Sequence, residues 1–264
     1  MVIQDRHKTA ELTARLWGAM EAKKIIRDAV TNVTLMRQTA IDKPGLALAI
    51  VQIKNFQARR FAGTYCDLLA SDQYKSAALF FLEELYSDKD YSERDAQFVR
   101  MAGALERLFP QQVVQTAVSL AQLHSLTEEL DQAMAEEWIA NAGLSEVARY
   151  VLAWRRVGRR ADRNRQLATV MAIGSELNHL TRTPGLRAML RMMRAPAKLA
   201  RLGALQRFLE TGFDTFAEMG QENDGAKHFL DLVTARESDL IEQLFDAETV
   251  TCETKILQLL GQTQ

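Results

Sequence analysis

PQQVVQTAVSLAQLHSLTEELDQAMAEEWIA, residues 110–140, is the clearest indicator of the fold class. Its apolar residues return every three or four positions, the spacing that places them on one face of an α-helix. Alanine, leucine, glutamine and glutamate, which are all good helix formers, fill many of its positions. Pro110 suits the first turn of a helix, and Asn141-Ala142-Gly143 suits its end. The sequence therefore predicts one long helix over these residues.

The same spacing continues along the whole chain, which has four prolines and thirteen glycines to interrupt it. A break is expected near residues 159–165, where Asp162 and Asn164 interrupt good helix formers. We therefore expect an all-α protein, a single helical bundle of about eight to ten helices with no significant sheet. Besides residues 110–140 and a short helix after Pro184, the pattern predicts helices over residues 5–39, 44–69, 71–86, 92–109, 145–181, 196–219 and 226–245.

No linker rich in Gly, Pro or Ser divides these helical tracts. Residues 1–246 are therefore predicted to form one all-α domain, followed by a loosely ordered C-terminal tail over residues 247–264. In this tail Val250, Cys252 and Thr254 alternate weakly, as they do in a short strand or a loose end.

The composition excludes several classes of protein. Hydrophobic residues make up 47% and charged residues 25% of the 264 positions, which is an ordinary globular mixture. The longest apolar runs have six residues, far fewer than the ~20 that a membrane span needs. The first 25 residues contain no apolar block of a secretory signal, and two cysteines are too few for a disulfide framework. We therefore expect a cytoplasmic protein without a membrane span.

Charge is distributed unevenly, although the net charge is −1. Residues 155–207, the basic tract, hold thirteen Lys and Arg against two acids, whereas residues 208–264 hold three against twelve. Such a basic tract can neutralise phosphates, which would suit a nucleic-acid-associated regulator. No nucleic-acid-binding motif accompanies it, so nucleic acid is the less favoured partner. We expect the basic tract to pair with the acidic segment, or to face an acidic protein partner or a membrane surface.

Motifs for nucleotide binding, serine hydrolysis and zinc proteolysis are absent from the sequence. Asp88, Asp90 and Ser92 have the spacing of the first ligands of a calcium loop. The sixth position of that loop is Glu93 instead of Gly, and the twelfth is Val99 instead of Glu. Two successive helix-capping signals explain the pattern better than calcium binding does.

Three parts of the chain carry a family resemblance. They read FFLEELY and RDAQ in residues 80–97, LHSLTEELD in residues 123–131, and LQRFLETGF in residues 205–213. Together they resemble an uncharacterised bacterial family of helical cytoplasmic proteins, over about residues 60–245. The resemblance implies a bacterial cytoplasmic protein, and it brings no activity with it.

Polar residues on apolar helix faces are the most informative candidates for a site, because they must find partners there. On a helical wheel, His124, Glu128 and Asp131 line one edge of the core face of the helix predicted over residues 110–140. These residues either form an internal network of salt bridges and hydrogen bonds or surround a ligand pocket. Three further helices bring polar residues toward the same interior, namely Arg94 and Asp95, Gln206, and Arg236.

A metal site is another interpretation of the histidines. Helical bundles hold di-iron centres with one Glu from each of two helices and a Glu-x-x-His motif from each of two others. Glu176 and His179 form one such motif, and His124 with Glu128 forms an i, i+4 pair on another helix. The pairs His7–Glu11 and His228–Asp231 have similar spacings, but a second Glu-x-x-His is missing. An iron or manganese centre is therefore the alternative rather than the leading interpretation.

The leading functional hypothesis is a binding module without catalysis, for a small ligand or a protein partner, which could be a second copy of the chain. The alternative is a metal-dependent oxidase-like or oxygenase-like bundle with non-haem iron or manganese on His124, Glu128, Glu176 and His179. A nucleic-acid-associated regulator is the second alternative. The candidate ligand-binding residues of the leading hypothesis are Arg94, Asp95, His124, Glu128, Asp131, Gln206 and Arg236.

Overall fold

A computed structural model describes the backbone of residues 2–84, 89, 91–108, 110–220 and 224–261, and within these the side chains of all residues except 2–20 and 103–108. These residues form helices and turns without a strand, which confirms the all-α prediction. More helices are present than the eight to ten expected. They are α1 (Val2–Asp42), α2 (Leu46–Thr64), α3 (Cys66–Ala70), α4 (Lys75–Glu84), α5 (Ser92–Leu108), α6 (Gln111–Ala140), α7 (Glu146–Val157), α8 (Arg160–Thr181), α9 (Leu186–Met192), α10 (Arg194–Leu199), α11 (Gly203–Met219), α12 (Gly225–Asp246) and α13 (Thr249–Gly261).

Most of the additional helices arise where predicted helices divide. The break expected near residues 159–165 occurs slightly earlier, at Gly158. This residue has a positive φ of 63°, and α7 ends there. Ser145 caps the start of α7 by accepting a hydrogen bond from the backbone N–H of Ala148. The segment predicted as one helix over residues 196–219 divides at Arg201, which also has a positive φ, of 56°.

Two Pro-Gly pairs make turns of the same kind. Gly45 and Gly185 both have φ 79° and ψ −14°, the left-handed conformation that glycine adopts without strain. In each turn the residue after glycine donates its N–H to the carbonyl three residues earlier, as in a type II turn. Pro44 and Pro184 therefore lie in the turns that precede α2 and α9. The helix predicted over residues 44–69 begins slightly later, at Leu46.

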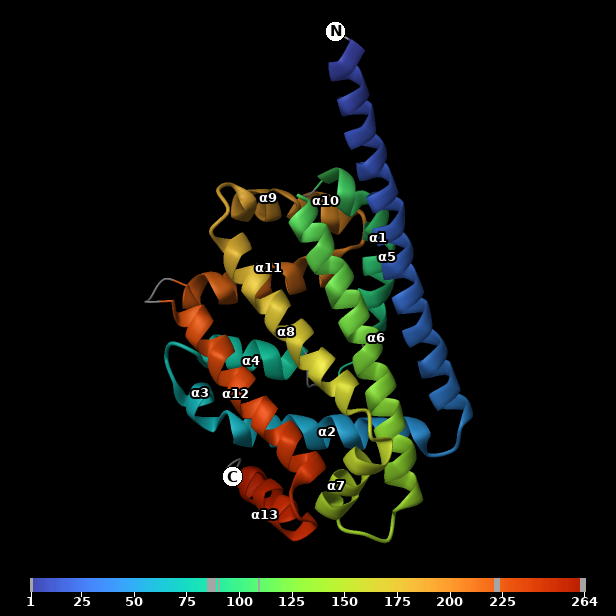
Figure 1. Cartoon of the computed structure of the whole chain (residues 1–264), viewed down its shortest axis with the longest axis vertical. Helices are drawn as coiled ribbons and strands as arrows, with labels where there is room; N and C mark the ends of the chain where they lie inside the picture. Colours follow the sequence, from blue (N-terminus) through green and yellow to red (C-terminus); the bar gives the residue numbers. More distant parts are fainter. Residues whose placement is uncertain (1, 85–88, 90, 109, 221–223, 262–264) are drawn as a thin grey trace.

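Helix α6 lies at the centre of the bundle (Figure 1). It packs against α1 along one side, against α8 along another, and against α2 and α7 toward its C-terminal half. Helix α8 runs antiparallel to α6 and packs on α12 and α11. This arrangement leaves the facing sides of α6 and α8 in the interior of the molecule.

Helix α13 occupies the region predicted as a loosely ordered tail or short strand. It packs on α2 and α7, and it buries Cys252, Ile256 and Leu259. These residues follow one another at intervals of four and three, which is the spacing of a helix face. The sequence left a short strand and a loose end open for this region, but residues 249–261 form a helix instead.

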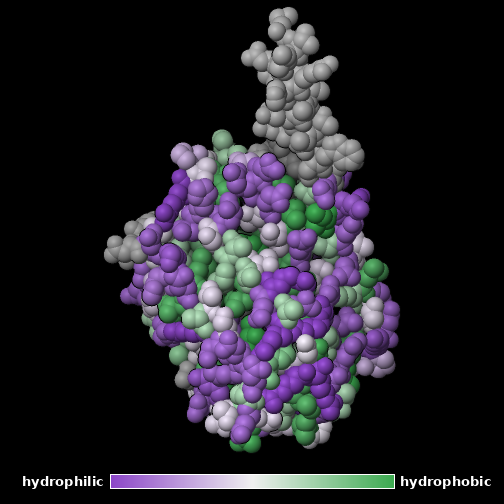
Figure 2. Space-filling model, viewed as in Figure 1, coloured by the Kyte–Doolittle hydropathy of each residue, from purple (hydrophilic) through white to green (hydrophobic). Residues whose placement is uncertain are grey.

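The surface seen in Figure 2 is largely hydrophilic, with hydrophobic residues interspersed among the charged ones. Across the part of the chain that the structure describes, no helix combines the length and apolarity that crossing a bilayer requires.

Candidate functional site

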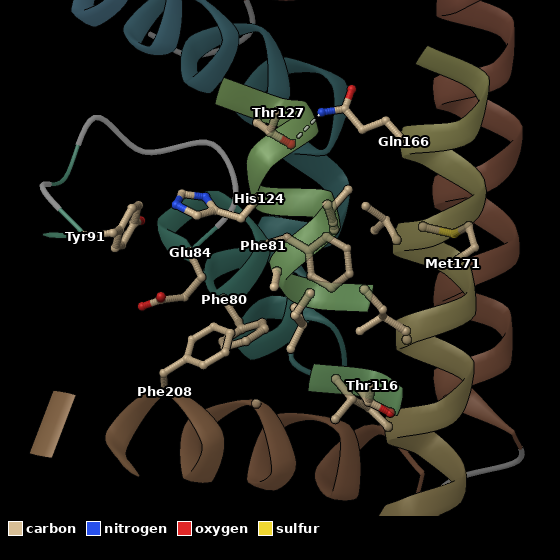
Figure 3. A pocket seen from close by; sticks show the side chains of 18 of the residues that line it. Phe80, Phe81, Glu84, Tyr91, Thr116, His124, Thr127, Gln166, Met171 and Phe208 are labelled. Carbon is tan, nitrogen blue, oxygen red and sulfur yellow. Dashed lines mark hydrogen bonds between the residues drawn. The ribbon is translucent and has the colours of Figure 1, made fainter. Parts of the chain in front are cut away.

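A cavity of about 240 Å³ lies between α6 and α8. Its lining follows α6 from Val113 to Asp131 and α8 from Arg163 to Leu180, and the other walls come mainly from α2, α4, α5, α11 and α12. Near one end of the cavity, Gln166 of α8 donates a hydrogen bond of 2.8 Å to the hydroxyl of Thr127 on α6, as Figure 3 shows.

Most side chains that line the cavity are apolar. Phe81 and Met171 extend toward each other from α4 and α8, and Phe80 lies beside Phe208 of α11 (Figure 3). The rings of Phe80 and Phe208 are stacked, with centroids 5.9 Å apart. Apolar walls with a few converging polar groups are the usual composition of a small-molecule site.

One end of the cavity is lined by buried charged groups. Lys54 Nζ lies 2.7 Å from Glu128 Oε1, and Gln57 Nε2 donates to Asp131 Oδ1 at 3.0 Å. Deeper in the core, Arg60 Nη1 lies 2.5 Å from the carboxylate of Glu237. Each carboxylate of this group therefore accepts a hydrogen bond from a protein side chain, as buried carboxylates must to offset their desolvation.

A second polar group lies along the wall formed by α5 and α6. Asp95 Oδ2 is 3.0 Å from His124 Nε2 and 2.9 Å from Arg37 Nη1, which reaches it from α1. Beside this group, Arg94 Nη1 lies 2.6 Å from Glu84 Oε2. The guanidinium of Arg94 also stacks on the rings of Tyr91 and Phe208, at 3.9 and 4.7 Å from their centroids.

Burial and pairing shift the pKa values of the Asp131 and Asp95 carboxyls in opposite directions. Burial raises the pKa of Asp131, and the nearby Lys54 charge opposes it without reversing the shift. Burial alone would also raise the pKa of Asp95. For Asp95, however, the hydrogen bond and charge of His124, together with Arg37, outweigh burial and lower the pKa.

The raised pKa of Asp131 predicts a pH-dependent effect of Asp131→Asn. The native state keeps the Asp131 proton to higher pH than the unfolded chain, whose carboxyl has the ordinary pKa of 3.8. The contribution of Asp131 to stability is therefore full below that value and falls as pH rises through the raised pKa. We expect Asp131→Asn to gain stability relative to the wild type between pH 4 and 7, measured by urea unfolding at several pH values. A relative loss over this interval would show that the charged form is favoured in the fold.

The structure brings five of the seven predicted ligand-binding residues to the cavity: Arg94, Asp95, His124, Glu128 and Asp131. The other two, Gln206 and Arg236, do not line the cavity and bind other parts of the protein.

Gln206 donates to the carbonyl of Leu190 at 2.7 Å and to Glu210 at 2.9 Å, so it joins α11 to α9. Arg236 extends to the surface, where both Nη atoms bind the carboxylate of Asp67 at 2.7 Å. The backbone of Arg236 lies on the apolar face of α12, but its long side chain carries the charged group to the surface, as arginine side chains commonly do.

Several residues of the cavity were missed from the sequence, namely Lys54, Gln57, Arg60, Arg163 and Glu237. A signal for three of them was available. Lys54, Gln57 and Arg60 recur at intervals of three among the apolar residues of α2, so they share one side of that helix.

The predicted metal ligands are not brought together. His124 binds Asp95 and Glu128 binds Lys54, while Glu176 and His179 lie on α8, the latter exposed. Within the described ranges, no group of three or more His, Cys, Asp or Glu side chains could hold a metal ion.

Two other sequence patterns fall outside what the structure describes. Asp88 and Asp90 of the calcium-loop spacing are outside the described residues, as are the side chains of His7 and Glu11.

The basic tract pairs in part with the acidic C-terminal segment, as the charge distribution predicted. Arg187 lies 2.8 Å from Asp214, Arg194 lies 2.7 Å from Glu210, and Arg182 lies 3.3 Å from Asp224. Arg160 forms a further ion pair with Asp246. These arginines therefore have intramolecular partners.

Comparison with known proteins places the chain in a family. No curated protein and no solved structure matches it. A family match covers residues 36–251, which include the cavity-lining parts of α2, α4, α5, α6, α8, α11 and α12. The chain therefore belongs to the family described as Domain of unknown function (DUF8198).

Proposed function

We propose that the protein binds a small, largely apolar ligand in the cavity between α6 and α8, without chemistry of its own. The observation that carries the proposal is the cavity itself, which has a volume of about 240 Å³ and mostly apolar walls. An engineered apolar cavity of about 150 Å³ binds benzene. By proportion, this cavity has room for a ligand of about ten non-hydrogen atoms.

The energetic cost of such a cavity supports a ligand. Protein interiors are close-packed, and voids larger than a water molecule are few. The apolar side chains that line such a cavity lose dispersion contacts that they would make in a close-packed core. A ligand that restores the missing contacts would recover part of the lost free energy. A cavity retained at this cost is more readily explained by function than by folding.

We also propose a cytoplasmic location, in a bacterium as the family resemblance implies. Cys66 and Cys252 are both free, and Cys66 is exposed. An exposed thiol suits a reducing compartment, where disulfides are rare. A metal centre gains no support from the separated ligands, and a nucleic-acid role gains none from arginines that already pair with carboxylates.

Indole, an uncharged molecule of suitable size, tests the proposal together with the variant Met171→Trp. The Met171 side chain extends into the cavity, so a larger side chain there should fill it. We expect indole at ten times its Kd to stabilise the wild type by about 1.4 kcal/mol, or roughly 3–6 °C in Tm. The Tm of Met171→Trp should not respond to indole.

Met192→Trp is the matched control, because Met192 is 71% exposed and does not line the cavity. This variant should respond to indole as the wild type does. An indole response that is the same in Met171→Trp as in the wild type would contradict binding in this cavity.

A further inference from the structure

Most carboxylates around the cavity are paired with cations. The described cations that line it are Lys54, Arg60, Arg94 and Arg163, and the carboxylates are Glu84, Asp95, Glu128, Asp131 and Glu237. Arg37 does not line the cavity, but it supplies a fifth cation through its ion pair with Asp95. Four of these carboxylates each have a cation as a partner: Glu128 has Lys54, Glu237 has Arg60, Glu84 has Arg94, and Asp95 has Arg37.

This pairing restricts the charge of a ligand. A buried charge is tolerated when an opposite charge or several hydrogen bonds compensate it. A ligand ammonium group would meet carboxylates that already bind Lys54, Arg60 or Arg94, and a ligand carboxylate would meet those cations with their partners in place. Either head group would bring one charge in excess into a buried site. An uncharged ligand avoids this cost.

The shape of the lining restricts the ligand further. The cavity-lining residues extend for about five turns along both α6 and α8, although the volume is about 240 Å³. A lining of that length can accommodate an extended molecule. It suits an elongated molecule, such as a hydrocarbon chain, better than a globular one.

Thr127 offers a hydrogen bond to such a molecule. Thr116, on the same helix, donates its hydroxyl hydrogen to the carbonyl of Gln112 at 2.9 Å. The hydroxyl of Thr127 instead accepts a hydrogen bond from Gln166, and no acceptor for its own hydrogen is found among the residues described. Because Thr127 lines the cavity, this hydrogen can bind an oxygen atom of the ligand.

We propose that the ligand is an uncharged, elongated and mainly apolar molecule of about ten non-hydrogen atoms, with an oxygen that accepts a hydrogen bond from Thr127. This inference rests on the proposed binding function. It adds the chemical class of the ligand, that of a medium-chain alcohol, aldehyde or ketone, as distinct from a fatty acid or an amine.

Three probes with the same eight-carbon chain test the charge. Calorimetric titration of the full chain at pH 7 with 1-octanol, octanoate and octylamine compares a neutral, an anionic and a cationic head group. We expect the Kd of 1-octanol to be at least about tenfold lower than that of either charged probe. Octanoate or octylamine binding as tightly as 1-octanol would overturn the inference.

Variants of Thr127 test the hydrogen bond. Thr127→Val removes the hydroxyl at nearly constant volume and should weaken 1-octanol binding several-fold, whereas Thr127→Ser keeps the hydroxyl and should bind normally. Equal affinity of Thr127→Val and the wild type would exclude the hydrogen bond.

Indole distinguishes an error in the ligand class from an error in the binding function. If indole stabilises the wild type but 1-octanol does not bind, the ligand class is wrong and the binding function stands. If neither binds, the binding function itself fails.

Discussion

Replacing Arg60 with Met should lower the free energy of unfolding by about 3–5 kcal/mol, the range for breaking a buried ion pair. Arg60 is 2% exposed, and its Nη1 atom lies 2.5 Å from Glu237 Oε1. The hydroxyl of Tyr65 lies 3.0 Å from the same oxygen. The variant would leave the Glu237 carboxylate in the core with no cation bonded to it. Urea unfolding followed by circular dichroism at pH 7 measures the loss.

The exposed pair Lys227–Asp231 provides the matched control. Its atoms are 2.8 Å apart, but both side chains are more than half exposed. Asp231→Ala should therefore change the stability by no more than about 0.5 kcal/mol. The double variant Arg60→Met with Glu237→Leu should lose less than the two single variants together, because it removes both charges. A loss below about 1 kcal/mol for Arg60→Met would show that Glu237 finds compensation from water or another side chain.

The fold class could be predicted from the sequence because helix periodicity is a local property. The spacing of apolar residues in 110–140 predicted α6 with nearly its observed bounds, since every contact that defines the helix lies within four residues. Helix ends were less predictable. Arg201 adopts a positive φ, a conformation in which glycine is the usual residue. The break between α10 and α11 could therefore not be predicted from the residue type at position 201.

The cavity could be predicted only in part, for a related reason. The helical wheel placed His124, Glu128 and Asp131 on the correct side of α6, because that depends on one helix. Their partners come from elsewhere: Lys54 is 74 residues from Glu128, and Asp95 is 29 residues from His124. Which side chains meet across helices depends on how the helices pack. No pattern in a single sequence contains that information.

The packing of α13 predicts that Gly63→Ala is strongly destabilising. A Cβ atom at Gly63 would lie 1.8 Å from the carbonyl oxygen of Leu259 and 2.6 Å from its carbonyl carbon. These are backbone atoms, so no side-chain rotation relieves the overlap, and α13 must move away from α2. That movement would disturb the packing of Ile256 and Cys252, which are buried. We expect a loss of about 3 kcal/mol or more, at the upper end of the range for overpacked cores.

Gly143→Ala is the control for this substitution, because a Cβ atom at Gly143 meets nothing within 4 Å. Its stability should stay within about 0.5 kcal/mol of the wild type. Both variants are compared by urea unfolding, and a protease that cleaves after Lys255 reports on α13 itself. In Gly63→Ala the displaced helix should be cut faster than in the wild type, because local opening exposes its backbone. If Gly63→Ala keeps the stability of the wild type, α13 does not pack against α2 in solution. Residues 247–264 would then be the loosely ordered tail that the sequence suggested.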